Sequence, residues 1–276
     1  MGGAIAPGIA AYSDTTGHLV IPKFVRRTIS LVLAVVLTAM PAVAQRHAPV
    51  PWVLGEYLEY SVKFAFINAG SGRMSVVGID TIRGRNAWHL RFNVTGGVSW
   101  LGCGVNDTYD SWVDVETLNS LRFHQNLSEC GNKRVRLYEI YPERAIFHLQ
   151  GTDEQPSVSD PLDDAAFLFF VRSLTLDVGK EYSIPRYFDP KSNPVIVKVL
   201  RKDTIDVAAG LFPAIVLQPI IKTSGLFSQD GHAEIWLSDD SRHILLQMKT
   251  KLNFGSLNMY LRKVTIPDSV GPVKKQ

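Results

Sequence analysis

The sequence predicts a mainly β fold, of the β-rich α+β class, in which a curved antiparallel sheet or half-barrel wraps around one apolar helix. Segments that alternate apolar and polar residues recur from about residue 55 to about residue 264, and each indicates a half-buried strand. Turn-forming residues separate these segments. One stretch, Ala165–Val171, is apolar at every position, and a helix without a polar face must be covered on most sides.

The first element, residues 1–44, has the pattern of an export leader preceded by an upstream extension. Positive charges between residues 23 and 27 precede the apolar run Ile29–Met40, and the Ala-Val-Ala tripeptide at 42–44 predicts cleavage before Gln45. The run has about 12 residues, fewer than the roughly 20 that span a bilayer. An uncleaved anchor or a buried helix is the alternative. We expect an exported protein, periplasmic or associated with the outer envelope, soluble after cleavage and without a transmembrane span.

The charge of the chain gives no reason to expect a nucleic-acid partner. The 276 residues include 29 Lys and Arg and 26 Asp and Glu, a net charge of +3. Without the leader, 26 basic and 25 acidic residues remain, a net charge of +1. Binding to a polyanion requires a concentrated basic surface, which this balance does not indicate.

Strands dominate the first half of the predicted fold. A proline-rich arm at 45–54 leads into a single β-rich domain at 55–266, although a split near 156–160 stays open. Residues 68–72 indicate a turn or bulge, and Pro142–Arg144 a hairpin connection. The predicted strands cover Leu58–Phe66, Met74–Val77, Trp88–Val94, Leu121–Leu127, Arg134–Tyr141 and Ala145–Leu149.

The helix is predicted over Ala165–Leu174. Asp160 can serve as its N-cap and Pro161 suits a first turn, while the carboxylates of Asp163 and Asp164 favour the positive end of the helix dipole. A short buried strand is the competing interpretation of this segment.

Strands return after the helix and continue to a polar tail at 267–276. Pro213 and Pro219 indicate edge positions or bulges, because proline cannot donate to a ladder. The expected strands lie in 195–200, 205–207, 212–221, 233–237, 244–251 and 258–264, with a polar hairpin loop at 238–242.

Motifs that carry enzyme chemistry are absent from the sequence. It contains no HExxH zinc motif, no Gly-x-Ser-x-Gly nucleophile elbow, no Walker loop and no dinucleotide fingerprint. We therefore predict no catalytic residues and no cofactor. His232 and Glu234 could place two metal ligands on one strand face, and His89, His124 and His148 could converge by folding. Solvated strand faces are the simpler explanation, and no metal site is predicted.

Cys103 and Cys130 are compatible with one disulfide. An exported protein meets an oxidising compartment, and both cysteines have loop-like neighbours. Two independent cysteines are the alternative.

Aromatic side chains are the candidate ligand-binding residues. If the sheet curves, its concave face would present them to the helix. The helix can fill that space and give an ordinary core, or it can leave an apolar cavity. The candidates are Phe64, Phe66, Trp88, Phe92, Phe123, Phe147, Phe169 and Trp236.

Several segments resemble a family of exported bacterial proteins known as domain of unknown function 3108. Gly55–Val62 resembles its first strand and Ala69-Gly70 the turn that follows. Asp160–Arg172 resembles its Asp-x-Leu-Ser…Tyr-x-Arg helix, with Asp in place of Ser and Phe in place of Tyr. Ala209–Phe212 resembles its Gly-x-Phe segment, and Glu234–Arg242 its Trp-Leu-Ser-x-Asp-x-Arg hairpin. The resemblance covers residues 52–264. It implies an exported β-rich protein, similar in architecture to lipoprotein carriers, and offers no catalytic residues.

Three functions follow as hypotheses. The first is a non-catalytic periplasmic binding module that holds a hydrophobic small molecule, a lipid or another envelope-derived ligand between sheet and helix. The second is an envelope structural or interaction protein with a filled core, which binds an envelope protein through a sheet edge or the loops near Cys103. A hydrolase is the third and least favoured.

Overall fold

Alternating side chains build a sheet in which each strand pairs with the next strand of the chain. The computed structural model describes residues 49–64, 67–98, 103–220, 233–252 and 255–267. The sheet has 14 strands in the order β8-β7-β6-β5-β4-β3-β2-β1-β14-β13-β12-β11-β10-β9. The strands are β1 (Tyr57–Phe64), β2 (Ile67–Ile82), β3 (Arg85–Val98), β4 (Cys103–Asp114), β5 (Ser120–Glu129), β6 (Asn132–Tyr141), β7 (Ile146–Leu149), β8 (Gln155–Pro156), β9 (Glu181–Ile184), β10 (Val195–Val207), β11 (Gly210–Ile220), β12 (Glu234–Ser238), β13 (Leu245–Leu252) and β14 (Gly255–Thr265).

The pairing of β1 with β14 joins the two ends of the described chain. Tyr57 lies opposite Thr265, and the two strands are antiparallel, as are all the neighbouring pairs of the sheet. The sheet stays open between β8 and β9, which are its edge strands and are only two and four residues long. Short edges limit edge-to-edge association. The predicted curved antiparallel sheet is confirmed, and it does not close into a barrel.

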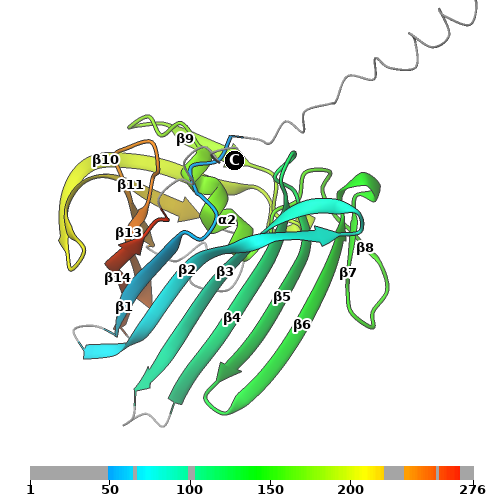
Figure 1. Cartoon of the computed structure of the whole chain (residues 1–276), viewed down its shortest axis with the longest axis horizontal. Coiled ribbons are helices and arrows are strands. Elements are labelled where there is room, and N and C mark those ends of the chain that lie inside the picture. Colours follow the sequence, from blue (N-terminus) through cyan, green and yellow to red (C-terminus); the bar gives the residue numbers. More distant parts are fainter. Residues whose placement is uncertain (1–48, 65–66, 99–102, 221–232, 253–254, 268–276) are drawn as a thin grey trace, which may run out of the picture. The chain divides into compact units, whose positions relative to one another are not determined.

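The one α-helix of the described residues lies between these two edges in sequence and on the concave side of the sheet in space (Figure 1). Helix α2 spans Asp164–Phe170 and continues as a 3-10 turn, η3, over Val171–Ser173. Further 3-10 turns are η2 (Pro142–Arg144) and η4 (Pro190–Ser192). The prediction of one apolar helix covered by a curved sheet is confirmed. No helix in the described ranges is long and apolar enough to span a membrane.

The predicted N-cap is corrected by the structure. Asp163, not Asp160, caps α2: its backbone is extended and its Oδ1 accepts a 2.9 Å hydrogen bond from the amide of Ala166. The reason is a contact with a distant segment, because Leu162 forms a parallel bridge with Tyr187. A residue held in a bridge is extended, so the helix cannot begin before it.

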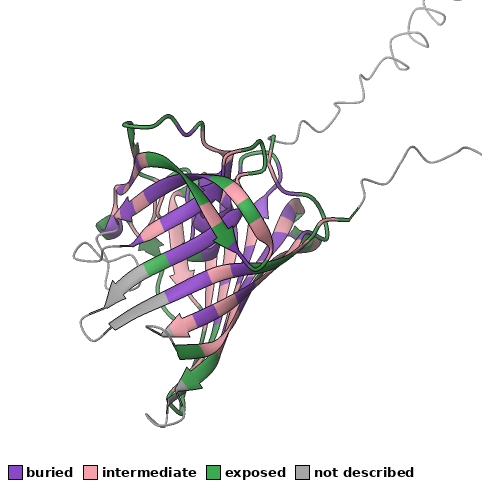
Figure 2. Ribbon diagram, turned by 90° about the vertical axis from the view of Figure 1, so that its left-hand side faces the viewer, coloured by how far each residue is buried: buried purple, intermediate pink, exposed green. Residues whose placement is uncertain are grey.

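Helix and sheet share one hydrophobic core. The main cluster joins the helix residues Ala166, Phe167, Leu168, Phe169 and Val171 to inward-facing residues of both halves of the sheet. In Figure 2 the buried residues lie along the strands, and exposed residues concentrate at strand ends and connections.

Some local predictions are confirmed and others are refined. Residues 68–72 continue β2, with a register shift opposite Val62 and Lys63, so the bulge alternative holds. Pro213 and Pro219 lie in β11 outside its paired stretch with β12, which is Ala214–Leu217 among the described residues. A missing N–H is tolerated there. Strand β4 is not among the predicted strands, because its three aspartates are poor strand formers.

Three predictions lie largely outside the described residues. These are the export leader, the polar tail and the side chains of Phe64, Phe66 and Cys103. The Cys130 amide donates a 2.8 Å hydrogen bond to the carbonyl of Gly104, the residue after Cys103. The disulfide and the domain boundaries stay predictions.

Candidate functional site

Among the described residues, side chains fill the space between the helix and strands β10–β12. The cavity between Phe167, Leu168 and Val171 on the helix side and strands β10–β12 has a volume of about 10 Å³. A single water molecule needs at least about 10–15 Å³, and small-molecule sites have about 300–1,000 Å³. This interface is therefore a packed core, and a ligand has to bind elsewhere or displace it.

Two of the candidate aromatic residues take part in this packing. Phe169 is fully buried, and its ring meets that of Trp52 edge to face, with ring centroids 5.8 Å apart. Trp52 also contacts the ring of Trp88, at 6.5 Å. Through these ring contacts, the segment before β1 packs against the helix and against β3.

Trp236 is 4% exposed and belongs to the main core cluster, but polar groups of neighbouring strands surround its ring. Its indole N–H donates a 3.0 Å hydrogen bond to Asp203, and the charged groups of Arg201 and Lys249 lie over its ring. Its neighbour Ile235 lines the small cavity beside the helix. Because successive side chains of a strand point to opposite faces, Ile235 takes the inward position.

A row of aromatic rings crosses the concave face from β3 to β6. Phe92, Tyr109, Phe123 and Tyr138 follow one another on adjacent strands, with ring centroids 6.1, 6.4 and 6.0 Å apart. Phe188, from the segment after β9, covers the β5–β6 end of this row and contacts Phe123, Tyr138 and the candidate Phe147. The sheet therefore gathers Phe92, Phe123 and Phe147 into one aromatic cluster.

Polar side chains lie beside this cluster on the same face. Tyr109, Gln125 and Arg136 are direct cross-strand partners on β4, β5 and β6, and side chains of partnered residues share a face. We call these three residues the polar row. Gln125 is only 8% exposed, and its carboxamide oxygen has no hydrogen-bond partner among the described residues. A buried polar atom without a hydrogen-bond partner lowers the stability of the folded protein by about 1–3 kcal/mol. A purely structural role does not explain why a glutamine occupies this position.

The charges around the polar row leave the guanidinium of Arg136 available. Arg134 is paired with Glu129, and the carboxylate of Asp107 accepts the amide of Ser128 at 2.8 Å. Among the residues that the structure describes, none forms an ion pair with Arg136. Burial, and next the charge of Asp107, raise the pKa of Tyr109, so its hydroxyl remains a protonated donor.

The sequence missed the polar row, although one signal was present. In β5, Leu121, Phe123 and Leu127 alternate inward, and Gln125 occupies an inward position among them. A polar residue at an inward position is the unusual observation that merits attention. The sequence could not show that Tyr109 and Arg136 lie beside Gln125, because this depends on the presence of β4 and on the register of three strands.

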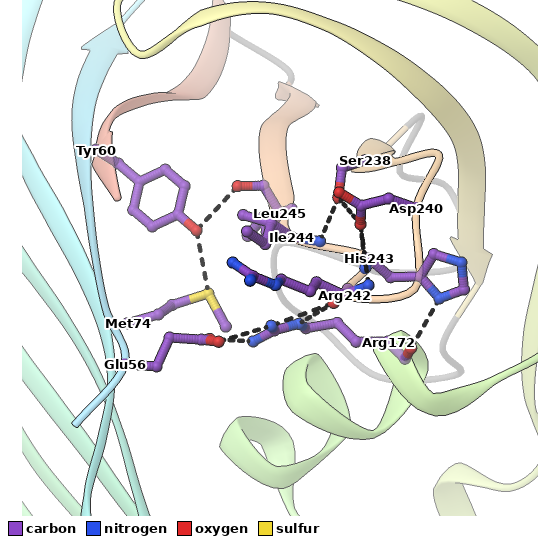
Figure 3. A network of polar contacts seen from close by, with 10 residues as sticks. All are labelled: Glu56, Tyr60, Met74, Arg172, Ser238, Asp240, Arg242, His243, Ile244 and Leu245. Atoms are coloured by element: carbon purple, nitrogen blue, oxygen red, sulfur yellow. Dashed lines mark hydrogen bonds and ion pairs between the residues drawn. The ribbon is translucent and has the colours of Figure 1, made fainter. Parts of the chain in front are cut away.

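A buried ion pair fixes the end of the helix (Figure 3). Arg172 is 1% and Glu56 2% exposed, and the guanidinium binds both carboxylate oxygens at 2.7 and 3.2 Å. The same guanidinium donates to the carbonyl of Arg242, at 3.3 and 3.2 Å. The backbone carbonyl of Arg172 in turn lies 2.8 Å from Nδ1 of His243. The segment before β1, the helix and the β12–β13 hairpin are joined at this point.

The cap of the helix is a second buried polar site. Asp163 is fully buried, and besides the amide of Ala166 its carboxylate accepts the hydroxyl of Ser111 at 2.5 Å. Its own amide donates to the hydroxyl of Ser120 at 2.9 Å. Burial outweighs these hydrogen bonds and raises the pKa of Asp163 to about 7.

Asp163 should make stability fall as pH rises. The folded protein holds a proton up to about pH 7, whereas an unfolded Asp releases it near pH 3.9, at its reference pKa of about 3.9. The folded state thus binds more protons between these values, and its free energy of unfolding decreases with pH there. Relative to wild type, Asp163→Asn should therefore gain stability between pH 4 and pH 7, measured by urea unfolding across this range. An unchanged difference at all pH values would contradict the raised pKa. Asp163→Ala, which removes the cap, should cost about 0.5–2 kcal/mol throughout.

The histidines of the outer sheet face belong to a network of polar contacts around Asp110. His89 Nε2 lies 2.8 Å from Asp110 Oδ1, its Nδ1 lies 3.3 Å from Asp80 Oδ2, and Arg91 also binds Asp110. Burial opposes ionisation of Asp110, but the hydrogen bonds of His89 and Arg91 prevail and lower its pKa. His124 reaches Asp110 at 4.0 Å. No group of three or more His, Cys, Asp or Glu in the described ranges is arranged to hold a metal ion.

Similar solved structures share parts of this architecture at low sequence identity. A beta-barrel-like protein of domain of unknown function DUF1849 from Brucella abortus is 11% identical, with a TM-score of 0.49, over 80% of this chain and 100% of its own. The hypothetical protein CT021 from Chlamydia trachomatis is 9% identical, with a TM-score of 0.36, over 79% of this chain and 90% of its own. With TM-scores below 0.5, these likenesses carry no argument about function.

Comparison at the sequence level identifies a family. No curated protein shows significant sequence similarity to the chain. The family model described as protein of unknown function (DUF3108) matches residues 59–262. This range contains the helix, Arg172 and the β12–β13 hairpin, which the structure brings together. The chain therefore belongs to the DUF3108 family.

Proposed function

We propose that the protein is an exported, non-catalytic binding module that holds a hydrophobic or envelope-derived ligand on the concave face of β4–β6. The observation that carries this proposal is the buried carboxamide of Gln125, whose oxygen has no partner among the described residues. Binding sites typically combine apolar and aromatic surface with a few such polar groups. The half-buried rings of Tyr109 and Tyr138 supply the apolar surface.

The place of the proposed site differs from the one that the sequence indicated. Our hypothesis put the ligand between sheet and helix, where the cavity of about 10 Å³ leaves no room for one. The polar row lies on the strands beside the aromatic cluster, so a ligand there leaves the helix packing intact. Export to the periplasm or the outer envelope remains part of the proposal and is supported by the leader pattern at 23–44.

The filled interface also favours the second function, an interaction protein of the envelope. Such a protein would bind a partner through its outer surface and would hold no small ligand. The two functions are separated by whether the concave face of β4–β6 binds an apolar probe.

Tyr138→Ala should weaken binding of the neutral fluorescent probe N-phenyl-1-naphthylamine by about fivefold. The reason is the loss of one aromatic face, since an aromatic pair contributes about 0.5–1.5 kcal/mol beyond its buried area. Binding is measured by fluorescence titration of the protein expressed from its full sequence, with native mass spectrometry to detect ligands that copurify.

Leu137→Ala is the matched control. Leu137 is the preceding residue of β6 and is also half-buried, but it points to the opposite face. Equal losses in both variants would place the probe elsewhere, and no binding by the wild type would favour the interaction protein.

A further inference from the structure

The polar row combines three groups with complementary hydrogen-bonding capacity. Arg136 contributes a positive charge and several donors, the hydroxyl of Tyr109 a further donor, and Gln125 a carboxamide that can donate and accept. They lie on adjacent strands, so the row extends over about 10 Å.

The other charged groups near the row are already engaged. Glu129 is paired with Arg134, and Asp107 with the amide of Ser128. Within the described part of the chain, Arg136 is the half-buried cation of this face that has no carboxylate partner. A guanidinium in this setting gains most from an anionic group, which it can bind through two parallel hydrogen bonds.

Apolar surface lies directly beside this cation. Tyr138 is two residues from Arg136 on β6 and therefore shares its face. Tyr109 lies on the other side of Gln125, and its ring continues into the aromatic cluster. A ligand that contacts the whole row has to be polar at one end and apolar at the other.

We infer that the ligand of the polar row is an anionic amphiphile, whose carboxylate or phosphate binds Arg136 and whose hydrocarbon part packs on Tyr109 and Tyr138. This inference rests on the proposed function and specifies its ligand. The Nε2–H of Gln125 can donate a hydrogen bond to the anionic group, and its buried Oε1 can accept one from a hydroxyl at the polar end of the ligand.

The test compares dodecanoate with dodecanol, which has the same chain but no charge. Both are titrated calorimetrically below the micelle concentration of dodecanoate. Wild-type protein should bind dodecanoate about tenfold more tightly or better, since hydrogen bonds to charged groups are the strong ones. Arg136→Gln should bring the two affinities close together, and Arg136→Lys should restore part of the difference.

Two further variants exclude a general effect of charge or folding. Lys133→Gln removes a positive charge from the opposite face of the same strand and should leave the preference for dodecanoate unchanged. Gln125→Leu should reduce this preference while the protein unfolds at the same or a higher urea concentration, because it removes an unpartnered polar group.

The outcomes separate this inference from the proposed function. Equal affinity of wild-type protein for both compounds, or an undiminished preference in Arg136→Gln, overturns the anionic ligand but leaves a hydrophobic site. Failure to bind dodecanoate, dodecanol and N-phenyl-1-naphthylamine overturns both.

Discussion

Replacing Arg172 with methionine should lower the free energy of unfolding by about 3–5 kcal/mol. The change leaves Glu56 as an uncompensated charge that is 2% exposed, and it removes both donors from the carbonyl of Arg242. Breaking a buried ion pair from one side has this cost. Urea unfolding followed by circular dichroism measures it.

An exposed pair of the same length is the control. Arg144 and Glu154 are also 2.7 Å apart, but both side chains are about half exposed. Arg144→Met should therefore cost at most about 1 kcal/mol. The double variant Arg172→Met/Glu56→Leu should recover part of the loss, because no charge stays buried. A loss below about 1 kcal/mol in Arg172→Met would show that packing alone holds the helix.

The second large effect is expected at Phe169, where alanine should cost about 3–5 kcal/mol. This side chain is fully buried and meets Trp52 edge to face. Removing a large aromatic side chain from a packed core loses its transfer free energy and leaves a cavity. If the interface already contained a cavity in the wild-type protein, Phe169→Ala would lower the free energy of unfolding much less. Urea unfolding of this variant therefore tests the packed interface directly.

Phe170→Ala separates packing from helix propensity. Phe170 is the next residue of α2 and only half-buried, with the guanidinium of Arg186 over its ring at 4.7 Å. Its loss should be clearly smaller than that of Phe169→Ala. We also expect an apolar probe such as benzene to bind Phe169→Ala, since cavities lined by apolar side chains stay dry and accept such molecules. If both variants lost a similar amount of unfolding free energy, this would contradict the finding that Phe169 is buried and Phe170 only half-buried.

The class of fold could be predicted because it depends on local patterns. Alternation places Leu58, Tyr60 and Val62 on one face of β1, and all three are buried as expected. The all-apolar run Ala165–Val171 forms the one described α-helix up to Phe170, continues into η3 at Val171, and is covered by the sheet. The motifs shared with the family were also recognisable in the sequence, although the reason for their arrangement was not.

The candidate site could be predicted only in part. Phe92, Phe123 and Phe147 lie in one aromatic cluster, as the alternation suggested. Trp236 belongs to the main core cluster, but its polar neighbours Arg201, Asp203 and Lys249 come from two other strands and cannot be predicted from its own strand. Tyr109 and Arg136 could not be predicted as site residues, because only the pairing of the strands makes them neighbours of Gln125.

Local sequence patterns predict most of the strands, the position of the helix and most of the inward side chains, because these properties follow from the period of a few consecutive residues. The tertiary structure decided the rest. It placed Leu162 against Tyr187 and so moved the helix cap to Asp163. It also set the register of β4, β5 and β6, which aligns the polar row. Register is fixed by the burial of whole strand faces against the core, and no single segment carries that information.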